Sequence, residues 1–142
     1  MFSGEYEYRI DAKGRVAIPP KFRGEFWDGI VLARGLERCI IAYPPPIWKE
    51  MAEKFSTLPI ARSKDRRIAR VMFGTAFNLE LDEQGRIILP PPLREYAGIK
   101  DTVVIVGLNN YLEIWSKELW EEELALMDEQ AWQIAEGMEH YR

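Results

Sequence analysis

The sequence of 142 residues contains one cysteine, Cys39, and one histidine, His140. A single cysteine cannot form a disulfide within the chain, which suits a reducing compartment. The two residues offer too few ligands for a zinc site of cysteine and histidine, and they leave no recognisable pair of nucleophile and base. We therefore expect no metal, no cofactor and no enzymatic activity, and we interpret Cys39 as a small buried hydrophobic residue.

Long hydrophobic runs are also missing. The longest apolar runs are only a few residues, too short to cross a membrane, and the opening MFSGEYE lacks the basic and apolar stretches of a secretory signal. No glycine-rich loop of the kinds that hold phosphates or dinucleotides occurs. The expectation is a cytoplasmic protein with no membrane contact and no small-molecule ligand.

An excess of positive charge is absent, since the net charge is −4, but the charges are unevenly distributed along the chain. From Glu113 onward the chain has two Lys or Arg against nine Asp or Glu, whereas the preceding part has 17 against 14. The acidity is thus confined to the C-terminal part, and the rest is mildly basic. This distribution permits a face that binds nucleic acid without demonstrating one.

An internal repeat organises the sequence. Residues 11–23 read DAKGRVAIPPKFR and residues 82–94 read DEQGRIILPPPLR, with six identities in 13 positions and three exchanges between apolar residues. The match continues upstream at the same offset of 71 residues, and downstream after a shift of one residue. Chance would supply about one identity at ordinary composition. The chain is therefore a duplication.

Each copy has the same predicted plan. Alternating residues such as Tyr6 and Tyr8 predict a half-buried strand, and Asp-x-x-Gly-Arg predicts a turn in which the carboxylate accepts backbone N–H groups and the glycine is left-handed. The turn-forming residues are Asp11, Gly14, Asp82 and Gly85. A second strand ends at a Pro-Pro pair, which begins a short helix. The remaining strands are expected near residues 30–34, 39–43, 76–81, 86–89, 102–106 and 111–115, and the helices near 21–26, from about 46, and near 61–73 and 117–136.

Each copy alone is too small to bury an adequate core. The two copies should therefore fuse into one α+β domain with pseudo-two-fold symmetry. The aromatic residues that recur in the repeat should pack in the core and at interfaces. They are Tyr43, Trp48, Trp115 and Trp120.

At the paired Asp-x-x-Gly-Arg…Pro boxes the chain resembles the MraZ family of bacterial regulators, which are built from two SpoVT-AbrB modules. The resemblance covers nearly the whole chain, from MFSGEYEYRIDAKGRVAIPPKFR through DEQGRIILPPPLREYAG to VGLNNYLEIWSKELW. It implies modules at residues 5–47 and 76–119, a helical connector at 48–75 and an acidic C-terminal helix at 120–142. It also implies swapped hairpins that interleave into one small β-barrel with flanking helices.

The same resemblance implies a function. Members of this family are transcription factors, usually repressors, that bind short direct repeats upstream of the division and cell-wall gene cluster, including their own gene. The implied partners are double-stranded DNA and further copies of the chain in a ring-like homo-oligomer. The implied location is the cytoplasm, in association with the nucleoid.

Five cations are the candidate DNA-binding residues: Lys13, Arg15, Lys21, Arg23 and Arg86. Arg15 and Arg86 each follow a glycine turn, where an arginine can contact guanine bidentately or hold a phosphate. Alternatively, each arginine pairs with its own Asp and braces the turn, and one side chain can do both. Because Lys13 corresponds to Gln84, we expect the first copy to carry most of the electrostatic attraction. Arg23 is equally well explained as a surface charge of the short helix.

Two helical segments carry opposite charge. The connector at 61–73 has five cations, and the C-terminal segment is acidic. The connector either lies along phosphates or forms salt bridges with the acidic helix, within the chain or between subunits. The alternative function for the whole protein is a ring-forming structural or protein-interaction adaptor without DNA binding, which intact Arg15 and Arg86 argue against.

Overall fold

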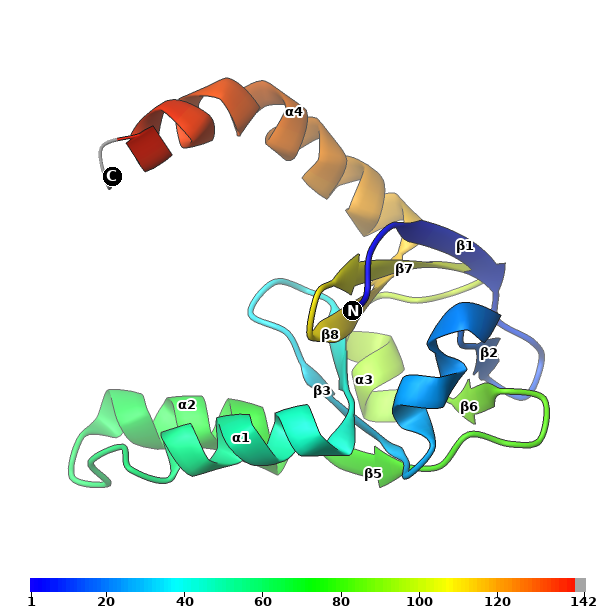
Figure 1. Ribbon diagram of the computed structural model, residues 1–142, viewed down its shortest axis with the longest axis horizontal. Helices are drawn as coiled ribbons and strands as arrows, with labels where there is room; N and C mark the ends of the chain where they lie inside the picture. The colour runs from blue at the N-terminus through cyan, green and yellow to red at the C-terminus, as the bar shows by residue number, and fades with distance from the viewer. Residues whose placement is uncertain (140–142) are drawn as a thin grey trace.

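The two repeats fold into the same succession of elements in the computed structural model, which describes residues 1–139 (Figure 1). In chain order these are β1 (Glu5–Arg9), β2 (Arg15–Ala17), the 3-10 helix η1 (Pro20–Phe26), β3 (Ile30–Arg34), β4 (Ile40–Tyr43), α1 (Pro45–Phe55), α2 (Ser63–Gly74), β5 (Phe77–Leu79), β6 (Arg86–Ile88), α3 (Pro91–Tyr96), β7 (Thr102–Leu108), β8 (Tyr111–Ser116) and α4 (Lys117–Glu139). The predicted strands and helices are confirmed, with shifts of a few residues at their ends. His140 and the rest of the predicted acidic segment after Glu139 lie outside the described residues.

Strands of the two repeats interleave in one antiparallel sheet of order β1-β7-β8-β4-β3-β5. The first strand of each repeat pairs with the other repeat: β1 with β7, and β5 with β3. The second strands, β2 and β6, pair with each other in a separate two-stranded ribbon. The mixed α+β class and the fusion of the copies are therefore confirmed. In the part of the chain described here β1 and β5 are the two edge strands of the sheet and do not pair with each other, so no closed barrel is found.

The main core lies between the sheet, the ribbon and the two short helices. It joins Val16 and Ile87 of the ribbon to Phe22 of η1, Leu93 of α3 and Leu32 of β3, all at most 4% exposed. The proline pairs explain how the ribbon leads into the helices. Proline cannot donate to a strand ladder, but its fixed φ suits the first helical position, where Pro20 and Pro91 lie.

A second, smaller core lies on the other face of the sheet, where α4 begins. Cys39, Trp115 and Trp120 are buried there at 0%, 4% and 6% exposure, and Tyr43 is also buried at 4%, whereas Trp48 is half-buried. Burial, with the nearby Glu113 carboxylate, raises the pKa of the Cys39 thiol. The prediction that Cys39 is a small buried hydrophobic residue is confirmed.

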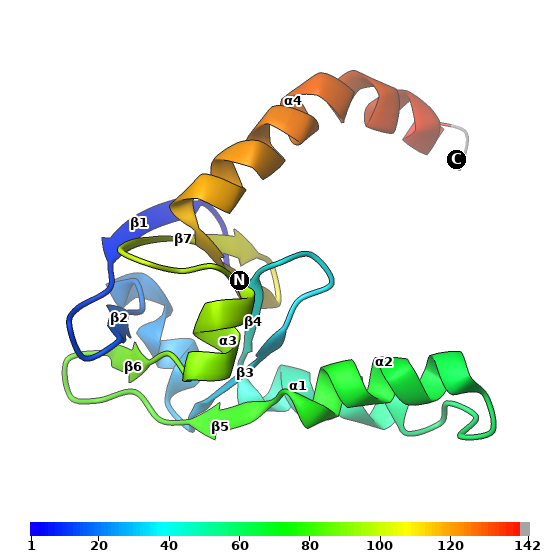
Figure 2. The same ribbon diagram turned by 180° about the vertical axis from the view of Figure 1, so that it is seen from behind.

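Two helical arms leave the body of the protein. The hairpin of α1 and α2 forms one arm and α4 forms the other, and both views show the arms extending to the same side, well separated from each other (Figures 1 and 2). No ion pair joins α2 to α4 within residues 1–139, so the predicted salt bridges between these helices are absent within one copy. Of the helices described, none is long and apolar enough to cross a membrane.

Candidate nucleic-acid interface

The ribbon of β2 and β6 places two arginines on one surface. Its register pairs Arg15 with Ile88 and Ala17 with Arg86, and directly paired residues share a face of the ribbon. The other face carries Val16 and is buried in the core. Arg15 and Arg86 are therefore diagonal neighbours on the outer face, and such neighbours lie about 7–8 Å apart.

The first turn is held by the carboxylate of Asp11. Its Oδ1 accepts the backbone N–H groups of Lys13 and Arg15 at 2.9 and 2.8 Å, and its Oδ2 accepts Nε of Arg15 at 2.6 Å. Gly14 completes the turn with φ of +80°, a conformation that favours glycine. The hydrogen bond from the Arg15 backbone is the main cause that lowers the pKa of Asp11, so the carboxylate stays ionised.

The second turn repeats this geometry. Asp82 accepts the backbone N–H groups of Gln84 and Arg86 and the Nε of Arg86, each at 2.9 Å. Gly85 has φ of +74°, and the hydrogen bond from the Arg86 backbone lowers the pKa of Asp82. Identical local geometry in both repeats shows that Asp-x-x-Gly-Arg encodes a self-contained turn.

The brace uses only part of each guanidinium group. Nε faces the aspartate, while the terminal nitrogens of Arg15 and Arg86 donate no hydrogen bond within residues 1–139. The two side chains are 29% and 27% exposed. An arginine held in this way keeps its terminal nitrogens available in a fixed orientation, so the structural and the recognition roles are compatible.

The other three candidate residues have different surroundings. Lys13 is exposed in the first turn, next to Arg15. Lys21 of η1 lies over the ring of Tyr6, with Nζ 4.9 Å from the ring centre. Arg23 donates from Nε to the carbonyl of Ile18 at 2.9 Å. The structure thus brings Lys13, Arg15 and Arg86 to the ribbon, whereas Lys21 and Arg23 are engaged in contacts within the protein.

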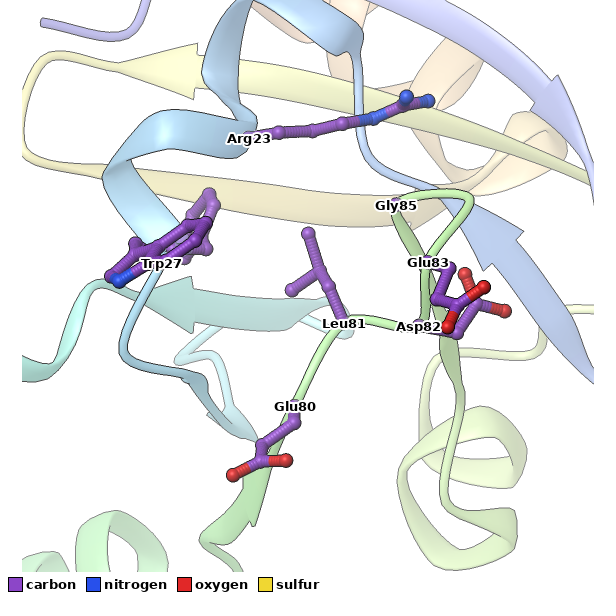
Figure 3. Close-up of a pocket in the computed structure, with 8 residues that line it drawn as sticks. Arg23, Trp27, Glu80, Leu81, Asp82, Glu83 and Gly85 are labelled. Atoms are coloured by element: carbon purple, nitrogen blue, oxygen red, sulfur yellow. The ribbon is translucent and has the colours of Figure 1, made fainter.

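A hollow of about 420 Å³ lies beside the second turn, between η1 and the segment from Glu80 to Gly85 (Figure 3). Trp27 stands on one side of it and is 89% exposed. Three carboxylates, those of Glu80, Asp82 and Glu83, line it as well. Acidic surroundings repel phosphates, so this side of the ribbon is less suited to DNA than the side of Lys13.

Sequence reasoning missed two exposed apolar residues of this region. Ile88 is 58% exposed and shares the outer face with Arg15 and Arg86. The two-residue period of the strand could have revealed it, because Ile88 follows Arg86 by two positions. Trp27 corresponds to Gly98 in the repeat, so comparison of the two copies marks it as a residue that only the first copy carries.

Comparison with known proteins identifies relatives along nearly the whole chain. The family described as "MraZ protein, putative antitoxin-like" matches residues 1–71 and 72–136. A protein of Dehalococcoides mccartyi is 50% identical over 142 residues, covering 99% of this chain and 100% of the relative. One of Herpetosiphon aurantiacus is 46% identical, covering 96% and 95%, and one of Thermoanaerobacter pseudethanolicus is 44% identical, covering 98% and 97%. All three relatives are called transcriptional regulator MraZ.

Proposed function

The chain belongs to the MraZ family, and from this membership we infer that it is a transcriptional regulator that binds double-stranded DNA in a sequence-specific manner. The observation that carries the proposal is the outer face of the ribbon, with Arg15 and Arg86 held diagonally across it. A two-stranded antiparallel ribbon fits the major groove of B-DNA. Arginines on its outer face can then donate two hydrogen bonds to O6 and N7 of guanine.

The cations around the ribbon would have different roles in DNA binding. Arg15 and Arg86 contact base edges, because their orientation is fixed by Asp11 and Asp82. Lys13 contacts a phosphate, because its side chain is exposed and flexible and its ammonium group lacks the planar donor fork that reads a base edge. Lys21 and Arg23 contribute long-range attraction to the DNA backbone while they keep their contacts within the protein.

The family resemblance extends the proposal to target and assembly. The target is a set of short direct repeats in the promoter of the division and cell-wall gene cluster, with the protein's own gene included, and the effect is repression by exclusion of polymerase. The working form is a ring-like homo-oligomer in the cytoplasm, associated with the nucleoid. Linked copies that read regularly spaced repeats bind far more tightly than one copy, because the later contacts form at high effective concentration.

The same resemblance suggests how the fold is divided. Residues 5–47 and 76–119 are the two SpoVT-AbrB modules, residues 48–75 connect them, and residues 120–142 form an acidic tail. The exchange of β1 and β5 between the repeats supports a swapped-hairpin origin for the interleaved sheet. The ribbon, to which both modules contribute one strand each, is then the joint DNA-reading element of the pair.

Binding to a labelled DNA fragment from directly upstream of the protein's own gene tests the function, across a salt series. Arg15→Ala and Arg86→Ala should each weaken binding by about tenfold to a hundredfold, because one bidentate contact is worth about 1–3 kcal/mol. Arg38→Ala is the control, since it removes the same charge from the exposed loop after β3. Sedimentation must show an unchanged assembly for all variants.

The outcome separates the two candidate functions. Tight, salt-sensitive binding that requires Arg15 and Arg86 but not Arg38 establishes a regulator that reads DNA through the ribbon. If the wild type binds the upstream fragment no better than random DNA, the protein is a ring-forming adaptor, and Asp11–Arg15 is a structural brace alone.

A further inference from the structure

The outer face of the β2–β6 ribbon carries one large apolar side chain beside its two arginines. Ile88 is directly opposite Arg15 and two positions along β6 from Arg86, so all three share this face. Ile88 is 58% exposed, whereas the neighbouring Ile87 is 2% exposed in the core. The ribbon lies on the side of the body away from both helical arms, so neither arm of the same copy covers Ile88 (Figures 1 and 2).

This residue breaks the symmetry of the outer face. Arg15 and Arg86 correspond to each other in the repeat, whereas Ile88 corresponds to Ala17. Ala17 pairs with Arg86 on the same face, is half-buried and has only a β-carbon as its side chain. A ribbon with identical residues on both strands would present the same face after a half turn and would read a site equally well in both orientations. The difference between Ala17 and Ile88 removes this equivalence.

The difference is at the end of the ribbon that also holds Lys13. The backbone N–H of Leu89 donates to the carbonyl of Gly14 at 2.9 Å, so the end of β6 lies against the first turn. A β-carbon at Gly14 would lie 4.0 Å from Cγ2 of Ile88, which places the Ile88 side chain at this turn. One end of the ribbon therefore combines Lys13, Arg15 and Ile88. The corresponding positions at the other end hold an uncharged glutamine, an arginine and a small alanine.

The spacing on the ribbon matches that of neighbouring base pairs. The β-carbons of directly paired residues such as Arg15 and Ile88 lie about 4.5–5.5 Å apart. Successive base pairs are about 3.4 Å apart along the axis of B-DNA. When the ribbon lies in the major groove and Arg15 contacts a guanine, Ile88 therefore faces the next base pair.

The chemistry of isoleucine selects one base at that position. Its side chain has no donor or acceptor, and the single apolar group that unmodified base pairs present in the major groove is the 5-methyl group of thymine. Against any other base edge, Ile88 would displace water from polar atoms without replacing their hydrogen bonds. Contact with one methyl group is worth about threefold to fourfold in affinity.

We propose that Ile88 contacts the 5-methyl group of a thymine in the base pair next to the guanine that Arg15 contacts, and that this contact sets the orientation in which the ribbon reads its site. The inference rests on the DNA binding proposed above and adds a specificity-determining residue to it. Arg15 and Arg86 select guanine at both ends of the ribbon, and Ile88 distinguishes one end from the other.

Removal of the methyl group from the DNA tests the contact without any change in the protein. The fragment from upstream of the protein's own gene is prepared with thymidine or with deoxyuridine, which pairs with adenine in the same way but lacks the 5-methyl group. We expect the wild type to bind the thymidine fragment at least about threefold more tightly. Ile88→Ala should remove about this factor from the ratio of the two affinities. Leu36→Ala, which truncates an 86% exposed residue in the loop between β3 and β4, should keep the wild-type ratio.

Substitution of single positions in the DNA locates the contact. Arg15→Ala should relax the preference for guanine at one position, and the base pair next to it should contain the thymine whose replacement by deoxyuridine weakens binding. The double variant with Ala17→Ile and Ile88→Ala moves the isoleucine to the position paired with Arg86. On DNA with thymine next to both guanines, the position sensitive to deoxyuridine should move from one guanine to the other.

The outcomes separate this inference from the proposed function. If the wild type binds the upstream fragment no better than random DNA, both are wrong. Specific binding that requires Arg15, with the same ratio of affinities for the wild type and Ile88→Ala, leaves the function standing and overturns the contact with thymine. A sensitive thymine that is not next to the guanine of Arg15, or that does not move in the double variant, overturns the proposed orientation.

Discussion

Arg23 of the first repeat closes over Gly85 in the turn of the second repeat, and a β-carbon at Gly85 would overlap its guanidinium group. The relationship is reciprocal, because a β-carbon at Gly14 would lie 3.6 Å from Nη1 of Arg94. Arg23 and Arg94 occupy matching positions in the two short helices. Each repeat therefore supports the turn of the other, and the arginine shared by both copies has a structural role in this fold.

Gly85→Ala should destabilise the protein by about 1–3 kcal/mol, because alanine at a positive φ is strained and its β-carbon displaces Arg23. Urea unfolding measures this change. Gly24→Ala in η1 is the matched control, since a β-carbon there meets nothing within 4 Å and the backbone is not left-handed. Equal stability of the two variants would show that the turn adapts to a side chain at Gly85.

Acid should weaken the two turns. The pKa of Asp11 and that of Asp82 are lowered below their ordinary value of 3.8 by hydrogen bonds from the backbone of Arg15 and Arg86. A lowered pKa in the folded state means that the carboxylates stabilise the fold fully above pH 3.8, and that this contribution is lost as the pH falls through the folded-state values.

The measurement is the unfolding free energy between pH 2 and pH 6, for the wild type and for Asp11→Asn with Asp82→Asn. The double variant should show a smaller loss of stability at the acid end, because neither turn then has a carboxylate to protonate. Glu83→Gln removes a carboxylate from the same second turn and leaves Asp82 in place, so it should retain the acid loss of the wild type. An identical acid loss in the double variant would contradict the assignment.

Lys13 should contribute more to DNA binding than its counterpart in the second repeat. Lys13→Gln is expected to weaken binding and to reduce the salt dependence by about one phosphate contact, whereas Gln84→Lys should strengthen binding. Titrations of the upstream DNA fragment at several salt concentrations measure both effects. The predicted asymmetry fails if Lys13→Gln weakens binding no more than Gln84→Ala does.

Two neighbouring isoleucines of β6 should separate stability from recognition. Ile87 is 2% exposed in the core, so Ile87→Ala should cost about 2–5 kcal/mol of unfolding free energy. Ile88 is 58% exposed on the outer face beside Arg15, so Ile88→Ala should change stability little and weaken DNA binding instead. Thermal unfolding and the DNA titration, performed on both variants, check the two statements. A large stability loss for Ile88→Ala would show that this face is covered in the assembly.

Local features of the fold were readable from the sequence because they depend on neighbouring residues. The alternation of Tyr6 and Tyr8 identifies β1, and the proline pairs mark the ends of β2 and β6. Asp-x-x-Gly-Arg specifies a turn because the aspartate and all of the donors that it accepts lie within five consecutive residues. The repeat itself shows that two such units exist and that they must share one core.

Contacts between distant segments were not readable in the same way. The sequence contains no signal that β1 pairs with β7 and β5 with β3, or that Arg23 covers Gly85, because strand partners and side-chain neighbours far apart in the chain are chosen by packing. For this reason the salt bridges predicted between α2 and α4 are absent within one copy. Opposite charge on two helices does not specify their distance.

The sequence by itself determined the duplication, the two braced turns and the family, since each of these is written in short motifs or in their repetition. The tertiary structure decided which surface those motifs build. Only the antiparallel register of β2 and β6 places Arg15 and Arg86 on one outer face, and only the packing of the start of α4 on β7 and β8 leaves Met127, Ile134 and Met138 exposed. Both outcomes depend on hydrogen bonds and contacts between residues that are remote in the chain, and the local sequence does not predict such contacts.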